Sequence, residues 1–479
     1  YPISKKKDDS MNFVGREREL KKLEELYREQ GFQFVVIYGR RRVGKTMLIN
    51  EFLKKKRSVY YMAVEGTAKE NLSGISKALL AEKNGDFYMP EFPDFESLLS
   101  YIDHLCKNAD HEERLVIAID EFPYLAASYP AISSMLQSHI DQRWKDSNLF
   151  LILCGSSMSF MEEQVLGYKS PLYGRRTAQF KLHPFSYFEA RQLLSGFKAE
   201  EQAVLYGVTG GIPEYLSRIH NDWSMDDNIK NLFFDESGRL FDEPGNLLKQ
   251  ELQDPSSYHS IITAIAGGAS RLNEIATKTG LASSGCSAQI QSLITLGIIK
   301  KETPLTEGIK SRKTLYQLED FMFLFWYRFV RPNLSGIMRG IGETIYDISV
   351  KPQLNHFMGY IFEEISKQYL YQPQIYITLP FPAGEFGRWW GNNQKKKRQE
   401  EIDIMAENGM EAIFGECKWR NEPVDVEVLE TLQERSGLFN YQKQSYMIFS
   451  KSGFTTKLQQ LASEEENIRL ISFKEMNQL

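Results

Sequence analysis

The clearest chemical pattern in the sequence lies in residues 39–46, which read Gly-Arg-Arg-Arg-Val-Gly-Lys-Thr. Glycines in such a turn let backbone N–H groups close around anionic oxygens at the start of a helix. Lys45 is expected to reach the outer phosphates of a nucleotide, and the hydroxyl of Thr46 to ligate Mg²⁺. The segment therefore predicts a site for ATP or ADP with Mg²⁺. Its members are Gly39, Arg40, Arg41, Arg42, Val43, Gly44, Lys45 and Thr46.

Two acidic residues, Asp120 and Glu121, directly follow the apolar segment 115–119. A carboxylate at the end of a buried strand beside a phosphate-binding loop can hold Mg²⁺ directly or through water, and this role is expected of Asp120. Glu121 is placed to polarise a water molecule for attack on the γ-phosphate. We therefore predict that Glu121 and Lys45 catalyse ATP hydrolysis. The alternative is that both carboxylates only cap the following helix.

Further polar residues follow the next apolar segment, 149–154. Ser156, or its neighbour Ser157, is expected to contact the attacking water or the γ-phosphate, although small polar residues are also common in turns. An arginine of the pair Arg175 and Arg176 is expected to stabilise transition-state charge in a neighbouring subunit, which would require a homo-oligomer. The alternative is a solvated pair of surface arginines.

A second group of chemical residues lies near the C-terminus, where residues 400–406 and 412–419 flank a turn and predict a β-hairpin. Because side chains alternate along a strand, Glu416 and Lys418 should share one face, and Asp403 on the partner strand can join them. Two carboxylates and a lysine can hold Mg²⁺ or Mn²⁺ and orient or deprotonate a water that attacks a phosphodiester. The alternative is that these charges only protect a strand from aggregation.

The elements that must position the nucleotide site alternate between strand and helix. Apolar segments at 32–38, 58–64, 115–119 and 149–154 predict strands, with helical segments between them. Strands of such uniform apolarity favour a parallel sheet that is covered on both faces. We therefore predict a doubly wound α/β domain over residues 11–195.

The rest of the chain divides into four predicted parts. Residues 196–254 indicate a helical lid and residues 255–318 a winged helix, followed by a helical linker over 319–351 and an α/β domain over 352–479. The winged-helix part has a net charge of +4, which favours contact with DNA phosphates. Its candidate recognition helix, 283–296, has no Lys or Arg, so the alternative is a spacer or a protein contact. The basic residues are Arg271, Lys278, Lys300, Lys301, Lys310, Arg312 and Lys313.

The bulk composition limits the remaining choices. A chain of 479 residues is too long for a single core, so several domains are expected. The formal net charge of −5 is not that of a generally basic nucleic-acid-binding protein. Four dispersed cysteines favour a reduced cytoplasmic compartment over disulfides or zinc. The apolar run 321–330 is about half the length of a membrane span, so no membrane association is expected.

Several motifs together resemble the archaeal-type P-loop ATPases, which are related to the AAA+ and signal-transduction ATPases. They are Phe13-Val-Gly-Arg-Glu-Arg-Glu-Leu20, the loop at 39–46, Ile119-Asp-Glu-Phe-Pro-Tyr-Leu125 and Gly210-Gly-Ile-Pro-Glu-Tyr215. The resemblance covers roughly residues 11–220. It implies that Gly15 and Arg16 lie near the adenine, and that Gly211 and Pro213 mark the lid side of the nucleotide pocket.

The C-terminal hairpin resembles the core of PD-(D/E)xK nucleases, which has a restriction-endonuclease-like fold. In that pattern a preceding helix supplies a glutamate, and Glu363 or its neighbour Glu364 fits, with Glu363 preferred. The implied metal ligands are then Glu363, Asp403 and Glu416. The leading Pro-Asp of the pattern is absent, and Glu401-Ile-Asp403 stands in its place. Residues 395–398, Lys-Lys-Lys-Arg, are a basic run that can meet DNA phosphates.

Two hypotheses follow. In the first, ATP binding and hydrolysis control a DNA-associated, metal-dependent nuclease at the C-terminus. In the second, the chain is a signalling or assembly switch whose bound nucleotide sets its conformation, and whose C-terminal module binds DNA or a partner without cleaving it.

Overall fold

The computed structural model describes residues 13–84, 91–107, 113–252, 254–308, 311 and 313–479. They fall into two compact units, each described here by itself. The first unit runs up to Phe185 and includes Ile212–Glu214, and the second contains Ser186–Gly211 and Tyr215–Leu479.

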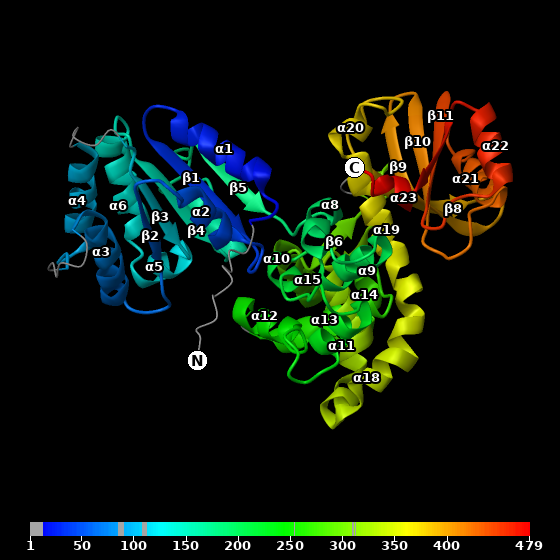
Figure 1. Ribbon diagram of the computed structural model, residues 1–479, viewed down its shortest axis with the longest axis horizontal. Helices are drawn as coiled ribbons and strands as arrows, with labels where there is room; N and C mark the ends of the chain where they lie inside the picture. The colour runs from blue at the N-terminus through cyan, green and yellow to red at the C-terminus, as the bar shows by residue number, and fades with distance from the viewer. Residues whose placement is uncertain (1–12, 85–90, 108–112, 253, 309–310, 312) are drawn as a thin grey trace, which may run out of the picture. The chain divides into compact units, whose positions relative to one another are not determined.

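The first unit is built on a parallel sheet of five strands in the order β2-β3-β4-β1-β5 (Figure 1). This confirms the predicted parallel sheet. The central strand β1 has neighbours on both sides, so its carboxyl end, where the phosphate-binding loop begins, lies in the middle of the sheet edge. The strands are β1 (Gln33–Gly39), β2 (Ser58–Met62), β3 (Val116–Asp120), β4 (Phe150–Gly155) and β5 (Ala178–Leu182).

Helices cover both faces of this sheet, as Figure 1 shows. Phe34 and Val36 of β1 point into a core shared with α3 to α6, while Val35 and Ile37 are buried on the opposite face. Every residue of β1 is buried, which explains its continuous apolar sequence. The helices are α1 (Glu17–Arg28), α2 (Lys45–Leu53), α3 (Ala68–Asn84), α4 (Phe95–Lys107), α5 (Phe122–Ser128), α6 (Ile132–His139) and α7 (Met158–Phe160).

The second unit begins with a helical region. The stretch α13 to α15 is followed by the antiparallel pair β6 (Ile299–Glu302) and β7 (Leu315–Leu318), which is the element order expected for a winged helix. The helices are α8 (Tyr187–Ala190), α9 (Ala199–Thr209), α11 (Met225–Phe233), α12 (Glu243–Glu251), α13 (Pro255–Ala266), α14 (Leu272–Thr279), α15 (Ser283–Thr295), α16 (Phe321–Phe325), α17 (Leu334–Gly336) and α18 (Gly342–Ile345). The short helix α10 (Pro213–Leu216) spans the boundary between the units.

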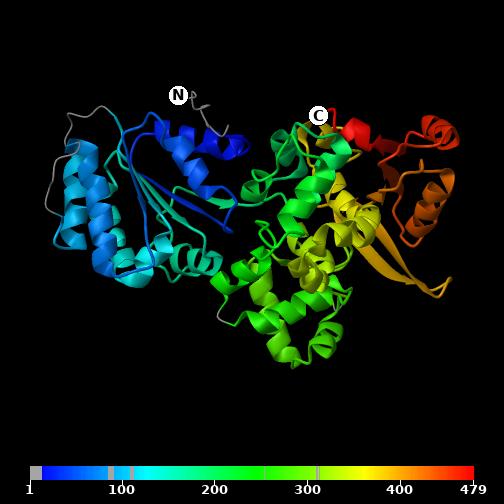
Figure 2. The ribbon, with the colours of Figure 1, turned by 60° about the horizontal axis from the view of Figure 1, so that its bottom comes forward.

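The C-terminal part of the second unit contains a mixed sheet in the order β12-β11-β10-β9-β8. The pairs β8–β9 and β9–β10 are antiparallel, whereas the pairs β10–β11 and β11–β12 are parallel. The β8–β9 hairpin projects from the end of this sheet (Figure 2). The elements are α19 (Leu354–Leu370), α20 (Pro373–Tyr376), β8 (Gly387–Asn393), β9 (Arg398–Asn408), β10 (Glu411–Lys418), α21 (Val426–Ser436), β11 (Lys443–Ser450), α22 (Thr456–Glu464), β12 (Ile468–Ser472) and α23 (Phe473–Met476).

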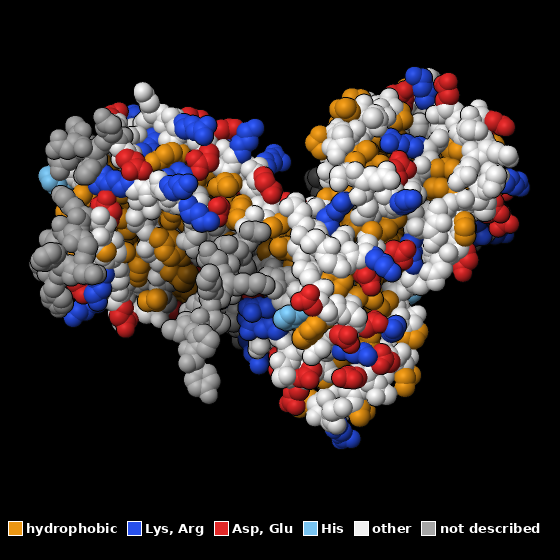
Figure 3. All heavy atoms as spheres, viewed as in Figure 1, with side chains coloured by type: hydrophobic (Ala, Val, Ile, Leu, Met, Phe, Trp, Pro, Cys, Tyr) orange, Lys and Arg blue, Asp and Glu red, His pale blue; other side chains and the backbone are white. Residues whose placement is uncertain are grey.

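Surface charge and helix length bear on the kinds of partner. On the face seen in Figure 3, basic and acidic side chains are interspersed over the second unit, in keeping with the net charge of −5. Among the described residues, no helix combines the length and the apolar character that crossing a membrane requires.

Candidate functional site

The phosphate-binding loop connects β1 to α2, as the sequence predicted. A Cβ atom on Gly39 would lie 2.4 Å from the backbone oxygen of Leu182, so only glycine lets β1 end this close to β5. Lys45 is buried, and its Nζ atom donates to the carbonyl oxygens of Gly39 and Arg40, each at 2.9 Å. The ammonium group therefore already lies inside the loop, where nucleotide phosphates can compete for it.

The carboxylate of Asp120 lies at the end of β3 and is held on both of its oxygens. Thr46 Oγ1 donates to Asp120 Oδ2 at 2.7 Å, and Tyr60 Oη donates to the same oxygen at 3.0 Å. The backbone N–H of Glu121 donates to Oδ1 at 2.9 Å. Burial, followed by the charge of Asp120, raises the pKa of Tyr60, so its hydroxyl stays protonated as a donor. This pairing of a hydroxyl and a carboxylate suits Mg²⁺.

Glu121 begins α5 with a backbone φ of 49°, in the left-handed region that non-glycine residues rarely occupy. Its Oε2 atom accepts hydrogen bonds from the backbone N–H and the hydroxyl of Ser156, at 3.2 and 2.8 Å. Ser156 therefore contacts the predicted catalytic carboxylate. A strained backbone at such a position is typical of functional sites.

Two of the residues assigned by resemblance to the nucleotide pocket, Arg16 and Pro213, lie close to the same loop. Arg16 is buried and donates to the backbone oxygen of Val43 at 3.1 Å. Pro213 lies near Gly44, since a Cβ atom on that glycine would be 3.9 Å from Pro213 Cγ. Glu214, which the sequence interpretation did not single out, forms an ion pair of 3.2 Å with Arg42. Its position directly after Pro213 was the only sequence signal.

Three further predicted residues are arginines. The guanidinium group of Arg175 binds Asp141 through Nε and Nη2, at 2.8 and 2.7 Å. Arg176 is half-buried beside it. Arg41 donates to the hydroxyl of Tyr124 at 3.0 Å. The role of Arg175 or Arg176 in a neighbouring subunit therefore stays a prediction.

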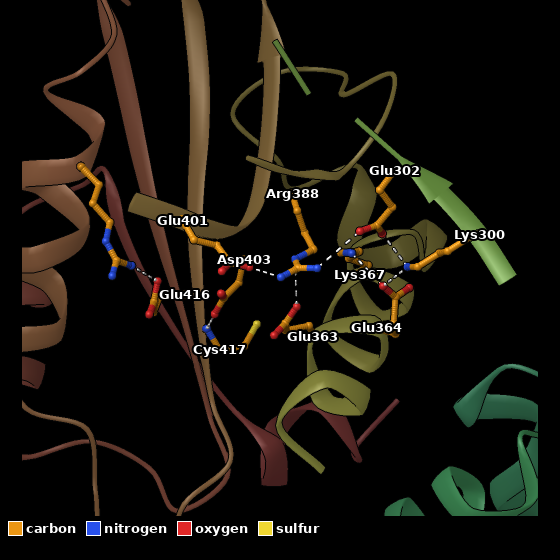
Figure 4. Close-up of polar contacts among 11 residues, drawn as sticks. Lys300, Glu302, Glu363, Glu364, Lys367, Arg388, Glu401, Asp403, Glu416 and Cys417 are labelled. Atoms are coloured by element: carbon orange, nitrogen blue, oxygen red, sulfur yellow. Dashed lines mark hydrogen bonds and ion pairs between the residues drawn. The ribbon is translucent and has the colours of Figure 1, made fainter. Parts of the chain in front are cut away.

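The C-terminal carboxylates come from one helix and two neighbouring strands (Figure 4). Glu363 lies on α19, Asp403 on β9 and Glu416 on β10. The backbone N–H of Cys417 donates to Asp403 Oδ2 at 2.9 Å. Lys418 Nζ donates to Glu416 Oε1 at 2.5 Å, because strand alternation places these two side chains on the same face.

Glu416 is buried, Glu363 and Asp403 are half-buried, and the three carboxylates repel one another. Burial and the charge of Asp403 raise the pKa of Glu363 to about 8, against the opposing effect of Arg388. The same two causes raise the pKa of Glu416. Glu363 Oε2 is buried and accepts no hydrogen bond from any residue that the structure describes. Three acidic groups this close together suit a proton or a divalent cation.

Cations of the protein itself contact two of the three carboxylates. Arg435 Nη1 on α21 lies 3.0 Å from Glu416 Oε2, and Arg388 Nε on β8 lies 3.5 Å from Glu363 Oε2. In this arrangement, no three Asp, Glu, His or Cys side chains within the described ranges are grouped so that they could hold a metal ion. A metal would therefore require some of these side chains to turn. Neither arginine was predicted, because no local spacing links it to the carboxylates.

The basic residues expected to meet DNA are partly engaged with acidic ones. Lys313 Nζ lies 2.5 Å from Glu307 Oε1, while Lys310 and Arg312 fall outside the described residues. Lys396 and Arg398, at the tip of the β8–β9 hairpin, form ion pairs with Glu434 and Glu400, each at 2.7 Å. DNA contact therefore stays a prediction.

Comparison with known proteins places both ends of the chain in families. Residues 13–219 match a family described as an ATPase domain predominantly from Archaea. Residues 326–433 match a family described as archaeal and bacterial proteins of unknown function.

Individual proteins are also similar to this chain. An uncharacterized protein of Methanocaldococcus jannaschii is 35% identical over 414 residues, which cover 85% of this chain and 88% of the relative. An uncharacterized ATP-binding protein of the same organism is 51% identical over 45 residues, or 9% of this chain and 76% of that protein. The solved structure of a Walker-type ATPase of Pyrococcus abyssi matches with a TM-score of 0.50 and 20% identity, covering 68% of this chain and 99% of that one.

Three findings lead to one conclusion. They are the fold, the geometry of the phosphate-binding loop, and the 35% identity to the first Methanocaldococcus jannaschii protein over 85% of this chain. The chain belongs to the archaeal P-loop ATPases, and it joins an ATP-binding and ATP-hydrolysing domain to a C-terminal domain of unknown function.

Proposed function

We propose that ATP binding and hydrolysis in this protein control a metal-dependent, nucleic-acid-cleaving C-terminal domain. In the ATPase unit, we assign Lys45 to the outer phosphates, Thr46 and Asp120 to Mg²⁺, and Glu121 to the attacking water. The hydrogen bonds from Ser156 keep the Glu121 carboxylate at a fixed position. Bound Mg²⁺ would supply charge neutralisation for the phosphates.

One observation supports the C-terminal assignment above all others. Asp403 lies close enough to Glu363 and Glu416 to raise the pKa of both, so that three acidic groups form one centre. A bound Mg²⁺ or Mn²⁺ would supply a Lewis acid at this centre. The fit rests on the raised pKa values and on the buried Glu363 oxygen that accepts no hydrogen bond within the described residues.

Lys418 supplies a fixed positive charge beside this centre. Burial alone lowers its pKa, but the neighbouring Glu416 raises it above the usual value. The ammonium group therefore stays protonated, so we assign it to orienting water or stabilising charge on the attacked phosphate. Of the two roles expected from the sequence, deprotonation of water fits this environment less well.

Cleavage assays test the proposal. Purified protein is incubated with plasmid DNA, single-stranded DNA or RNA, with Mg²⁺ or Mn²⁺, and with or without ATP. We expect Asp403→Asn to lower the cleavage rate roughly a hundredfold, because it removes the central carboxylate. Glu407→Gln, an exposed change on the same strand, is the matched control and should cleave normally. The proposal fails if the unaltered protein cuts none of these substrates under any of these conditions.

A specific observation favours a second candidate function. Arg388, Lys418 and Arg435 already contact Glu363 and Glu416, so the charge of these carboxylates is partly balanced without a metal. This would suit an ATP-dependent signalling or assembly switch, in which the C-terminal module binds a partner or DNA and does not cleave.

A further inference from the structure

Strand β6 packs against the C-terminal sheet through the loop that follows it. The backbone N–H of Leu305 donates to the carbonyl oxygen of Arg388 at 2.9 Å, which extends hydrogen bonding beyond the edge strand β8. The side chain of Leu305 packs against the core of the C-terminal domain. A Cβ atom on Gly387 would lie 3.0 Å from Leu305 Cδ1, so the close approach depends on a small residue there.

Two charged residues of β6 enter an ion-pair network with α19 and β8 (Figure 4). Lys300 Nζ lies 2.6 Å from Glu302 Oε1 and 2.9 Å from Glu364 Oε1. Lys367 on α19 lies 2.8 Å from the same oxygen of Glu364. The Lys300 side chain is only 20% exposed, so its ion pairs are largely shielded from solvent.

Arg388 lies between the two groups of acidic residues. Its Nη1 atom lies 3.4 Å from Glu302 Oε2 of β6, and its Nε atom lies 3.5 Å from Glu363 Oε2 of α19. It also contacts Glu401 on β9. The contact with Glu363 is loose, because neither Arg388 Nε nor Glu363 Oε2 makes a hydrogen bond to any described residue. Arg388 thus contacts Glu302, Glu363 and Glu401, and its side chain is 11% exposed.

We propose that Arg388 competes with a divalent cation for Glu363. When a cation binds Glu363, the displaced guanidinium group of Arg388 pairs with Glu302 instead. The inference rests on the proposed metal site at Glu363, Asp403 and Glu416. A second positive charge a few ångströms away weakens cation binding, and an alternative anionic partner lowers the cost of moving that charge aside. The position of β6 therefore sets the metal affinity of the C-terminal site.

The first test measures Mn²⁺ binding directly. Free Mn²⁺ is followed by electron paramagnetic resonance during titration of the nucleotide-free full chain. We expect Arg388→Met to tighten Mn²⁺ binding about tenfold or more, because it removes the competing charge. Arg388→Lys keeps the charge and should bind nearly as the unaltered protein does. Arg469→Met removes an arginine from β12 of the same sheet, where it donates to Thr378, and should change nothing.

The second test is a double-mutant cycle with Glu302. Glu302→Gln should weaken Mn²⁺ binding several-fold in the unaltered protein, because Arg388 then has no second partner on β6. The same change should have almost no effect when residue 388 is Met. An equal weakening in both backgrounds would mean that Glu302 acts without Arg388 and would overturn the proposal.

The outcomes separate this inference from the proposed function. If Asp403→Asn abolishes Mn²⁺ binding but Arg388→Met does not tighten it, the metal site stands and the role of Arg388 is refuted. If neither the unaltered protein nor Arg388→Met binds Mn²⁺, both ideas fail. Thermal unfolding of each variant checks folding. If Arg388→Met does not fold, Arg388→Gln is titrated with Mn²⁺ instead. The proposal then stands only if Arg388→Gln binds Mn²⁺ more tightly than the unaltered protein.

Discussion

The carboxylate of Asp120 receives hydrogen bonds from three donors, and they come from different parts of the first unit. Thr46 begins helix α2, Tyr60 lies on the neighbouring strand β2, and the third donor is the backbone of Glu121. Asp120 is only 1% exposed, so its charge depends on these donors. Of the three, Tyr60 is the donor whose removal leaves both predicted Mg²⁺ ligands in place.

The contribution of Tyr60 can be measured with a single hydroxyl deletion. We expect Tyr60→Phe to lower kcat for ATP hydrolysis about tenfold, since a hydrogen bond to a charged group contributes roughly 1.5–3 kcal/mol. The Mg²⁺ concentration needed for half-maximal rate should rise, while KM for ATP should stay nearly constant. Steady-state assays over a range of Mg²⁺ check both.

The adjacent tyrosine provides the matched control. Tyr61 points to the other side of β2, where its hydroxyl donates to Asn71 at 2.8 Å. Tyr61→Phe should leave the Mg²⁺ dependence unchanged. Equal Mg²⁺ dependence in the two variants would show that Tyr60 contributes packing alone.

At the level of elements, helix α19 carries two neighbouring glutamates with opposite behaviour. Burial alone would raise the pKa of Glu364, but Lys367 and Lys300 lower it to about 2. Burial and Asp403 raise the pKa of Glu363 instead. One helix therefore presents an anion that binds β6 and a second acidic group that faces the Asp403 centre.

The lowered pKa of Glu364 predicts how stability depends on pH. Its folded-state pKa lies below the unfolded value of 4.5, so its stabilisation is present above that value and is lost as the pH falls toward about 2. We expect Glu364→Gln to lower the free energy of unfolding by roughly 1–3 kcal/mol at neutral pH. Urea unfolding should show this difference shrinking as the pH is lowered through about 4. A difference that stays constant with pH would mean that Glu364 stabilises by packing and not by charge.

At the level of the whole molecule, the two proposed activities belong to different units. The predicted nucleotide residues are all in the first unit apart from Gly211, whereas the C-terminal carboxylates and strands β6 and β7 are in the second. Segment Ile212–Glu214 belongs to the first unit although its flanking residues belong to the second, so the chain crosses between the units beside the phosphate-binding loop.

Nucleotide control can be tested with Lys45→Ala. We expect this variant to lose ATP hydrolysis, because it removes the ammonium group inside the loop, and its nucleic-acid cleavage should no longer respond to ATP. Sedimentation with and without ATP is measured in parallel. Oligomers that form with ATP in the unaltered protein, fail to form in Lys45→Ala and accompany no metal-dependent cleavage would favour the assembly switch.

Local patterns in the sequence were sufficient to predict which residues lie together at the ends of β1 and β3. The loop at 39–46, the strand ending at Asp120 and the alternation that pairs Glu416 with Lys418 each depend on residues close together in the chain. Residues this close in the chain have little choice of position, because a buried parallel strand and the alternation of its side chains fix where each of them points. The parallel sheet was predicted for the same reason.

Tertiary structure alone decided which distant charges meet. Arg388 and Glu302 are separated by 86 residues, and Tyr60 reaches Asp120 only because β2 pairs with β3. No spacing in the sequence specifies such pairs, since they depend on which strands become neighbours and in what register. The sequence by itself thus determined a nucleotide site and a set of acidic residues, whereas the fold determined which cations balance those acids.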